Sequence, residues 1–502
     1  MSSTTTNMPS KEHYIIAIDQ STSATKAMLF NEQCQLLRRY DLPHQQHYPQ
    51  KGWVEHDAVE IYNNMVRSIR QVISDIDLSR HTFSLAITNQ RETIVVWDKN
   101  TGKPITNAIV WQDNRGADIC KQMKLQGMQE LVMRKSGLMI DPNFSASGVK
   151  WIMDNIEGAH EAAVKGDLIM GTIDTWLIWR LTGGQHFVTD TTNASRTMLF
   201  NIHTMTWDDD LLKLFDIPKS MLADVLPCDT VFGLTTIEGL FDPPIPIAGV
   251  LGDSHGALVG QMCFTEGAGK VTYGTGSSVM VNIGETPLPA PAGLVTSVGF
   301  SAMGRNYYGY EGNIYSTGAT LKWISDQLRL VNHPSEMEAL AMTVKDNGGV
   351  YIVPAFAGLG APWWNPNAKA GVVGMTFDTT RAHFLRAALE SIAYQIKDLI
   401  DVMEKAIGGH MKEICADGGP TKNTFLMQFQ SDLLGTPIVC TEVEDASALG
   451  AVIMNGFARK RWTGFNEVTH YRNVIRVFEP HPHKDTEALY AGWRNAVIQL
   501  TK

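Results

Sequence analysis

The sequence predicts an α/β protein built from two related lobes. A buried strand over residues 13–19 (HYIIAID) leads through a hydroxyl-rich turn into an apolar strand over 26–30. The same order of strand, turn and strand returns over residues 270–283, around the turn 274–278 (GTGSS). Helical patterns over 57–75 and 383–405 alternate with strands, which is typical of α/β folds.

No Pro- or Ser-rich linker precedes the second hairpin, which follows residues 260–267 directly. We therefore place the lobe boundary there and expect one lobe over 11–262 and another over 263–502. Without a long linker, the lobes are expected to pack against each other with a cleft between them.

Composition excludes several classes of protein. The 502 residues include 44% hydrophobic and 19% charged residues, which excludes a largely disordered chain. Lys and Arg number 42 against 52 Asp and Glu, giving a net charge of −10, and no basic run occurs. Nucleic-acid binding is therefore not expected, because it normally requires a basic stripe.

The cysteines and the apolar segments point to a cytoplasmic protein. The six cysteines are scattered without a C-x-x-C pair, which argues against a zinc module or a disulfide framework. The first ten residues are polar, unlike a signal peptide. No run of 18 apolar residues occurs, so no membrane partner is expected.

Three turns have the composition of phosphate- or nucleotide-binding loops. Thr22 and Ser23 offer hydroxyls and backbone N–H groups beside Asp19, whose carboxylate suits Mg²⁺. Residues 274–276 (GTG) allow a ligand to approach the backbone. Residues 414–423 (ICADGGPTKN) predict a strand, a Gly-Gly turn and a helix start. Ordinary polar turns would show the same residues. The P-loop and dinucleotide fingerprints are absent.

Polar residues at two strand ends could hold a small polar substrate. Arg91 and Glu92 follow an apolar strand over 84–88, and both can meet one ligand only if the strand ends or bulges there. A surface ion pair is the alternative. Trp111 could cover a carbon chain or lie in the core. Asp253 follows the apolar run 246–252, where it could act as a general base or cap the next helix.

Longer motifs resemble one known family. The segments are 48–57 (YPQKGWVEHD), 88–93 (TNQRET), 171–179 (GTIDTWLIW), 193–202 (NASRTMLFNI), 354–362 (PAFAGLGAP) and 389–395 (LESIAYQ). From about residue 13 to the C-terminus, the chain resembles the FGGY carbohydrate kinases of the actin-like ATPase superfamily. The resemblance implies two ribonuclease-H-like lobes around a central cleft, ATP with Mg²⁺ as cofactors, and a polyol or ketose as substrate. It also implies a homodimer or homotetramer.

The resemblance assigns roles to matching positions. It implies that the N-terminal lobe binds the acceptor and the C-terminal lobe the nucleotide, with Asp253 as base and with Asp19 and Asp253 near the metal. Acceptor contacts would come from Arg91, Glu92, Trp111, Asn143, Asp253, Ser254 and Ser278. Nucleotide contacts would come from Thr22, Ser23, Ala24, Lys26, Thr275, Gly318, Lys322, Gly419 and Asn423.

Departures from the family pattern concern the acceptor pocket. Members that act on glycerol have Tyr, Gln and Phe at the positions of Asn143, Ser254 and Ser278. Smaller polar side chains predict a larger, more hydrophilic pocket, so we expect a four- or five-carbon polyol or ketose, with glycerol a poorer substrate. Lys26 replaces a family Arg and keeps the charge without the bidentate fork.

Two other functions share part of this pattern. An actin- or chaperone-like ATPase that changes shape without phosphorylating a small molecule would have the same hairpins. It would not need Arg91, Glu92 and Asp253 around a second small pocket. A non-catalytic sugar-binding relative would not need Asp19, Thr22 and Asp253 intact.

Overall fold

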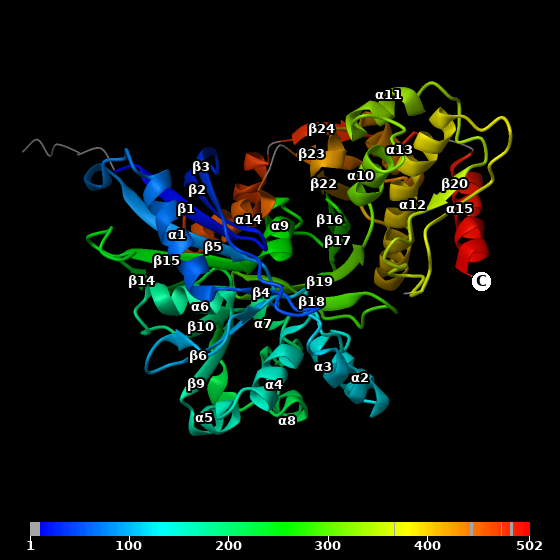
Figure 1. Cartoon of the computed structure of the whole chain (residues 1–502). Helices are drawn as coiled ribbons and strands as arrows, with labels where there is room; N and C mark the ends of the chain where they lie inside the picture. Colours follow the sequence, from blue (N-terminus) through cyan, green and yellow to red (C-terminus); the bar gives the residue numbers. More distant parts are fainter. Residues whose placement is uncertain (1–10, 366, 442–444, 473, 482–484, 502) are drawn as a thin grey trace, which may run out of the picture. The chain divides into compact units, whose positions relative to one another are not determined.

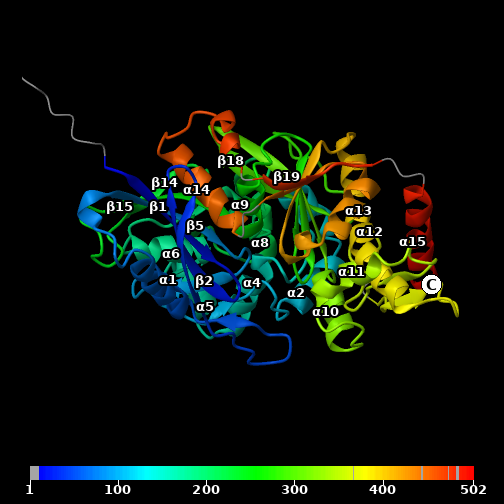
Figure 2. The ribbon, with the colours of Figure 1, turned by 90° about the horizontal axis from the view of Figure 1, so that it is seen from above.

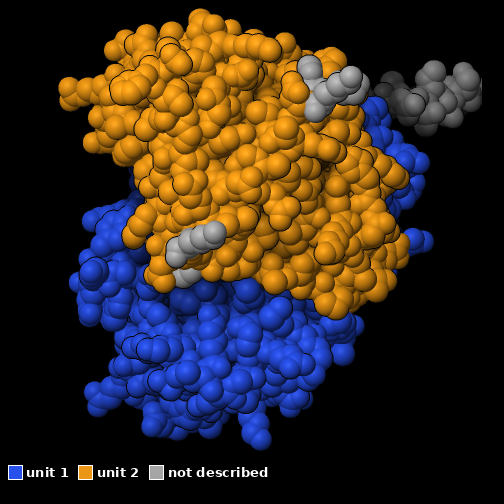
Figure 3. All heavy atoms as spheres, turned by 90° about the vertical axis from the view of Figure 1, so that its right-hand side faces the viewer, with its two compact units in different colours: residues 1–260, 300–306, 447–471 blue, residues 261–299, 307–446, 472–502 orange. Residues whose placement is uncertain are grey.

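The structure is a computed structural model that describes residues 11–365, 367–441, 445–472, 474–481 and 485–501 (Figure 1). The chain forms two compact units, which Figure 3 colours separately. Unit 1 contains the described residues up to Gly260 together with Phe300–Asn306 and Ser447–Tyr471. Unit 2 contains Gln261–Gly299, Tyr307–Ala446 and the described part of Arg472–Lys502. No helix in these ranges is long and apolar enough to cross a membrane.

The main sheet of unit 1 has six strands in the order β14-β15-β5-β1-β2-β3. β1 runs antiparallel to β2 and parallel to β5, and β5 runs parallel to β15. The strands are β1 (His13–Gln20), β2 (Ala24–Asn31), β3 (Leu36–Pro43), β5 (Thr82–Asn89), β14 (Val231–Thr235) and β15 (Ile245–Gly252). The predicted N-terminal hairpin is therefore confirmed.

Two helices lie beside this sheet (Figures 1 and 2), and their apolar side chains are buried in the same core. α1 (Ala58–Val72) begins where the Asp57 carboxylate accepts hydrogen bonds from the backbone N–H groups of Val59 and Glu60. Its buried face and that of α6 (Ile173–Leu181) join one core with the sheet. Burial of such side chains contributes about 1.5–3 kcal/mol each, so this core holds both helices against the sheet.

The rest of unit 1 contains a second sheet, two short strand pairs and further helices. A second, five-stranded sheet contains β4 (Glu55–His56), β6 (Ile94–Asp98), β7 (Lys103–Pro104), β8 (Ala108–Ile109) and β9 (Leu168–Thr172). Two short pairs are β10 (Val188–Asp190) with β13 (Asp224–Leu226), and β11 (Phe200–Asn201) with β12 (Thr206–Trp207). The further helices are α2 (Ala117–Leu125), α3 (Gln129–Ser136), α4 (Ser145–Asn155), α5 (Ala159–Lys165), α7 (Thr191–Ala194), α8 (Asp209–Phe215), α9 (Asp253–Gly260) and α14 (Ala446–Ala458).

Unit 2 is built on a seven-stranded sheet in the order β18-β19-β17-β16-β22-β23-β24. The β16–β17 hairpin is antiparallel, and β22 pairs with β16 in parallel, which repeats the arrangement of β1, β2 and β5. The strands are β16 (Ala268–Tyr273), β17 (Ser277–Asn282), β18 (Val295–Ala302), β19 (Arg305–Ile314), β22 (Glu413–Asp417), β23 (Ile438–Thr441) and β24 (Val474–Phe478). Both α/β assignments and the second hairpin are confirmed.

The helices of unit 2 pack around α12 (Arg381–Ile407), which begins at a capping box formed by Thr380 and His383. Asp398 on α12 accepts hydrogen bonds from the Tyr490 hydroxyl and from the indoles of Trp363 and Trp493. Burial raises the pKa of Asp398 to about 6. These bonds hold α15 (Thr486–Thr501) against α12. The other elements are α10 (Gly318–Asp326), α11 (Met337–Ala341), α13 (Thr424–Leu434), β20 (Tyr351–Val353) and β21 (Gly371–Val373).

Candidate active site

Arg91 and Asp253 lie side by side because β5 and β15 end together. In their parallel register, Asn89 is paired with Gly252. The Nε atom of Arg91 lies 3.0 Å from Oδ1 of Asp253. A Cβ atom on residue 252 would lie 2.5 Å from Cγ of Arg91, so any larger residue there would force the Arg91 side chain to move. Carboxyl ends of parallel strands are where ligands bind in α/β sheets, and the Asp253 side chain is 36% exposed.

Glu92 is turned out of the strand direction. Its φ of 65° lies in the left-handed region, and the backbone N–H of Thr93 donates to the Arg91 carbonyl at 2.7 Å. The chain therefore turns sharply after Arg91. Because the strand ends here, the neighbouring side chains of Arg91 and Glu92 can meet one ligand, as the sequence analysis required. A non-glycine residue held at positive φ costs about 1–3 kcal/mol, and such strain clusters at functional sites.

Arg196 is a site residue that the sequence analysis missed. Its Nε atom donates to Oε1 of Glu92 at 2.5 Å, and its guanidinium lies 5.1 Å from the ring centre of Phe144. The hydroxyl of Ser145 donates to the Glu92 carbonyl at 2.8 Å. Arg196 lies within the motif at 193–202, so the resemblance contained its position but assigned it no role.

Asn143 and Ser254 lie next to residues of this cluster. Asn143 is half-buried and directly precedes Phe144. Ser254 follows Asp253, and its backbone N–H donates to Oδ1 of Asp253 at 2.6 Å. Asp253 is the first residue of α9, so the helix-start role considered above and the role of a carboxylate at a strand end are compatible.

The turn between β1 and β2 is held in shape from several directions. The backbone N–H of Ser21 donates to the Ala24 carbonyl at 3.0 Å, and Gln46 Nε2 donates to the Thr22 carbonyl at 2.7 Å. The Trp111 indole donates to the Thr22 hydroxyl at 2.9 Å. Trp111 is 36% exposed, so the core alternative for this residue is wrong.

Asp19 and Lys26 face each other across the same hairpin. Lys26 Nζ lies 2.7 Å from Oδ2 of Asp19, whereas Ser23 at the turn is exposed. The hairpin therefore places a carboxylate, an ammonium group and the hydroxyls of Thr22 and Ser23 at one end of β1 and β2. These groups can bind a phosphate together with its cation.

In unit 2, three glycine-containing loops meet at the turn 274–276. The backbone N–H of Gly318 donates to the Gly274 carbonyl at 3.0 Å, and that of Thr317 donates to the Thr275 carbonyl at the same distance. A Cβ on residue 318 would lie 2.5 Å from the Gly274 oxygen, and one on residue 418 would lie 1.9 Å from the Tyr273 oxygen. The structure thus brings together Thr275, Gly318 and the loop of Gly419, all predicted to line the nucleotide.

The remaining nucleotide candidates flank these loops. Lys322 is exposed on α10, one turn beyond Gly318. Asn423 caps α13, with its Oδ1 accepting from the Leu426 N–H at 2.8 Å. Ser278 lies on β17 opposite Thr272 and Asn313, and its buried hydroxyl has no hydrogen-bond partner among the residues that the structure describes.

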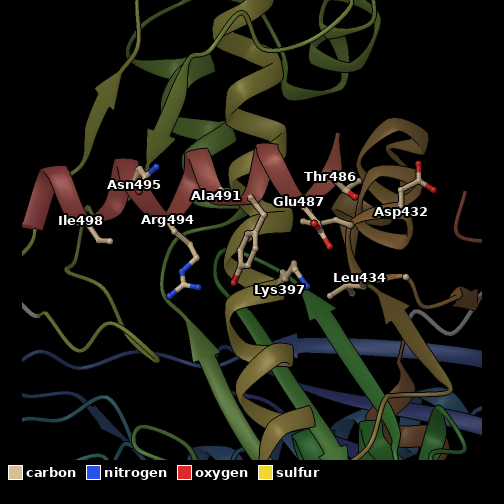
Figure 4. A pocket seen from close by; sticks show the side chains of 12 residues that line it. Lys397, Asp432, Leu434, Thr486, Glu487, Ala491, Arg494, Asn495 and Ile498 are labelled. Carbon is tan, nitrogen blue, oxygen red and sulfur yellow. The ribbon is translucent and has the colours of Figure 1, made fainter. Parts of the chain in front are cut away.

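A separate groove of about 670 Å³ contains none of the predicted site residues. It lies among α12, α13 and α15, where Lys397, Glu487 and Arg494 contribute charged side chains (Figure 4). The volume of this groove therefore does not make it the candidate active site.

Two α/β units that each carry an antiparallel hairpin with polar loops, one of them beside an arginine–carboxylate cluster, fit the class of protein that the resemblance implies, the carbohydrate kinases. Models of the N- and C-terminal domains of the FGGY family of carbohydrate kinases match residues 14–260 and 269–459. The chain belongs to the FGGY family of carbohydrate kinases, whose reaction is phosphoryl transfer to an alcohol group.

Relatives and solved structures agree with this assignment. A glycerol kinase of Geobacillus sp. (strain WCH70) is 47% identical over 488 residues, 97% of this chain and 98% of the relative. One of Bacillus anthracis (strain A0248) is 45% identical over 491 residues, 97% and 99% of the two chains. The structure of Plasmodium falciparum glycerol kinase with ADP matches with a TM-score of 0.94 and 34% identity, covering 98% of this chain and 99% of that one. The expected ribonuclease-H-like, actin-like ATPase fold is confirmed.

Proposed function

We propose that this protein transfers the terminal phosphoryl group of ATP to a hydroxyl of a small polyol or ketose. The observation that carries the proposal is the cluster of Arg91, Glu92 and Asp253 at the joined ends of β5 and β15, in a chain of this family. Arg91 and Glu92 orient the acceptor through hydrogen bonds to its hydroxyls. Asp253 accepts the proton of the reacting hydroxyl. At the same time, the oxygen of that hydroxyl forms the new bond to phosphorus, and ADP leaves.

The donor groups of the chain suit ATP with Mg²⁺. The hydroxyl-rich turn between β1 and β2 offers hydrogen bonds to phosphate oxygens, with Lys26 as a cation nearby. The loops that meet at residues 274–276 offer close approach to a nucleotide. The oxygens of Asp19 and Asp253 suit Mg²⁺, which prefers oxygen ligands and retains waters. The bound ion would supply charge neutralisation of the phosphates. Positioning and charge neutralisation are the main requirements of phosphoryl transfer.

We further propose that the preferred acceptor has four or five carbons. Ser278 stands where family members that act on glycerol have Phe, and its buried hydroxyl lacks a partner among the described residues. A buried unpaired hydroxyl is unfavourable, so an acceptor with an additional hydroxyl would satisfy it. Asn143 and Ser254 add further hydrogen-bonding groups at the other altered positions.

A coupled ADP-release assay over three- to six-carbon polyols and ketoses tests the proposal. We expect turnover that depends on the acceptor, with a four- or five-carbon compound giving a higher kcat/KM than glycerol. ATP hydrolysis that no acceptor changes would contradict phosphoryl transfer and would favour an actin- or chaperone-like ATPase. Turnover that is highest with glycerol would contradict only the acceptor size.

The Ser278→Phe variant tests the acceptor pocket directly. We expect the ratio of kcat/KM for glycerol to that for the best larger acceptor to rise about tenfold or more, because a phenyl ring fills the space and removes the hydroxyl. Ser278→Ala is the matched control, since it removes the hydroxyl without filling the space. It should weaken the larger acceptor with no gain for glycerol. An unchanged ranking in Ser278→Phe would contradict the enlarged pocket.

The resemblance to the family also supports a cytoplasmic homodimer or homotetramer. Sedimentation velocity on the full chain distinguishes these assemblies from a monomer.

A further inference from the structure

Asp190 is a fully buried carboxylate at the centre of a hydrogen-bond network behind the candidate site. Its Oδ1 accepts from the backbone N–H and the side-chain amide of Asn193, at 3.0 and 2.8 Å. Its Oδ2 accepts from the backbone N–H and the hydroxyl of Thr192, at 2.7 and 2.6 Å, and from the Cys228 thiol at 3.3 Å. The carboxylate thereby fixes the side chains of both Thr192 and Asn193.

These two side chains reach the two strand ends that carry the cluster. The Thr192 hydroxyl accepts a hydrogen bond from the backbone N–H of Gly252 at 2.9 Å, and Gly252 directly precedes Asp253. The Asn193 amide exchanges two hydrogen bonds with the Asn89 amide, at 3.0 and 2.9 Å. Asn89 is the last residue of β5, two positions before Arg91.

We propose that Asp190 is a positioning residue that holds the ends of β5 and β15 in the alignment that phosphoryl transfer requires. This inference rests on the proposed function of Arg91, Glu92 and Asp253. Because the Thr192 hydroxyl proton is directed to Asp190, its oxygen faces the Gly252 N–H. Because the Asn193 amide nitrogen is directed to Asp190, the orientation of the amide pair with Asn89 is fixed.

Helix capping is the structural alternative, because Asp190 is also the N-cap of the short helix α7. Capping explains the two backbone hydrogen bonds that Asp190 accepts. It does not explain why the side chains of Thr192 and Asn193 turn to the same carboxylate and then continue to Gly252 and Asn89. The two roles predict different effects on catalysis.

Asp174 provides a matched control. Its carboxylate is also fully buried, and it accepts from the hydroxyls of Thr172 and Thr189 at 2.5 and 2.7 Å. Burial and the nearby charge of Asp190 raise the pKa of Asp174 to about 7, and burial raises the pKa of Asp190. No hydrogen bond described for Asp174 reaches Gly252 or Asn89. Asp174→Asn therefore perturbs the same buried region, including the charge that Asp190 senses, while the hydrogen bonds described for Asp190 keep their partners.

The first experiment compares Asp190→Asn with Asp174→Asn in the full chain, by thermal unfolding and steady-state kinetics. An asparagine at 190 presents a donor to groups that themselves donate, so the network must rearrange. We expect kcat/KM for the acceptor to fall at least about 30-fold in Asp190→Asn, since small misplacements of reacting groups have large effects on rate. Asp174→Asn, at a comparable loss of Tm, should change it less than about threefold. Loss of activity in proportion to Tm in both variants would overturn the proposal.

A second experiment separates the hydrogen bond between Thr192 and Gly252 from the amide pair of Asn193 and Asn89. It does not depend on whether Asp190→Asn folds. Thr192→Val removes the oxygen that accepts from Gly252, whereas Thr192→Ser keeps it. We expect Thr192→Val to lower kcat about tenfold with the acceptor KM nearly unchanged, because the hydrogen bond that positions Gly252 and the adjacent Asp253 is lost. Thr192→Ser should retain most of the parent kcat. Asn193→Ala should instead raise the acceptor KM, because Arg91 loses its support. Equal kinetics of the Val and Ser variants would overturn the proposal.

Arg91→Ala and Asp253→Asn complete the series and distinguish the two possible failures. If both retain turnover, the proposed function of the cluster is wrong, and the positioning role is overturned with it. If both lose turnover while the Asp190 and Thr192 variants do not, the cluster is catalytic and only the positioning role is overturned.

Discussion

Asp253→Asn should lower kcat by at least about 100-fold while the acceptor KM stays close to its value in the parent protein. Asn has the same size as Asp and keeps an oxygen that can accept from the Ser254 N–H, so the hydrogen bond of 2.6 Å at the start of α9 persists. A neutral oxygen still faces Arg91, whose Nε lies 3.0 Å from the Asp253 carboxylate, although the ionic part of that contact is lost. The ability to take a proton from the acceptor hydroxyl is lost as well.

Initial rates at saturating ATP over a range of acceptor concentrations separate kcat from KM in this variant. Asn is also a good N-cap, so a role limited to starting α9 would leave turnover intact. Asp57→Asn makes the same change at the start of α1, remote in sequence from the cluster, and should leave kcat unchanged. A kcat within about threefold of the parent protein in Asp253→Asn would exclude Asp253 as the general base.

Local patterns in the sequence predicted the framework that carries this residue. The strand over 13–19, the helix over 57–75 and the helix over 383–405 correspond to β1, α1 and α12. Each depends on side-chain periodicity within a short segment, which a sequence displays directly. The strand before Asp253 was predicted in the same way, from the apolar run over residues 246–252, which Asp253 follows directly.

Contacts across long stretches of chain could not be predicted in this way. Arg196 contacts Glu92 across 104 positions, and neither the spacing nor the residue types indicate that pair. The positive φ of Glu92 and the hydrogen bond from Ser145 to its carbonyl are likewise not indicated by the local residue types. Asn455 likewise joins unit 1 through hydrogen bonds to Ala248 and Ser84. Such pairs become visible only when the fold brings distant segments together.

The resemblance to the family pointed to some site residues that local patterns could not predict, but it missed others. It pointed to Gly318, which the structure places against the Gly274 carbonyl, a contact that no periodicity predicts. It gave no role to Arg196 or Asp190, although both lie in or beside a quoted motif. A residue that acts by holding another in place leaves no chemical signature of its own in a sequence.

Substitutions at Gly418 and Gly419 should separate the shape of the nucleotide loop from its contact with the nucleotide. Gly418 has a φ of 99°, and a Cβ there would lie 1.9 Å from the backbone oxygen of Tyr273. Gly418→Ala must therefore displace the loop, and we expect the KM for ATP to rise at least about 30-fold, together with a lower Tm.

Gly419→Ala is the sharper test, because a Cβ at this position meets no atom of the described structure within 4 Å. The protein should fold with an unchanged Tm. If the nucleotide packs against this backbone, the added methyl group occupies its space at a cost of about 1–3 kcal/mol, so the KM for ATP should rise about tenfold or more. Gly409→Ala is the control, since a Cβ there also meets nothing within 4 Å and the residue follows α12 away from the loop. An unchanged KM for ATP in Gly419→Ala would show that the nucleotide does not contact this turn.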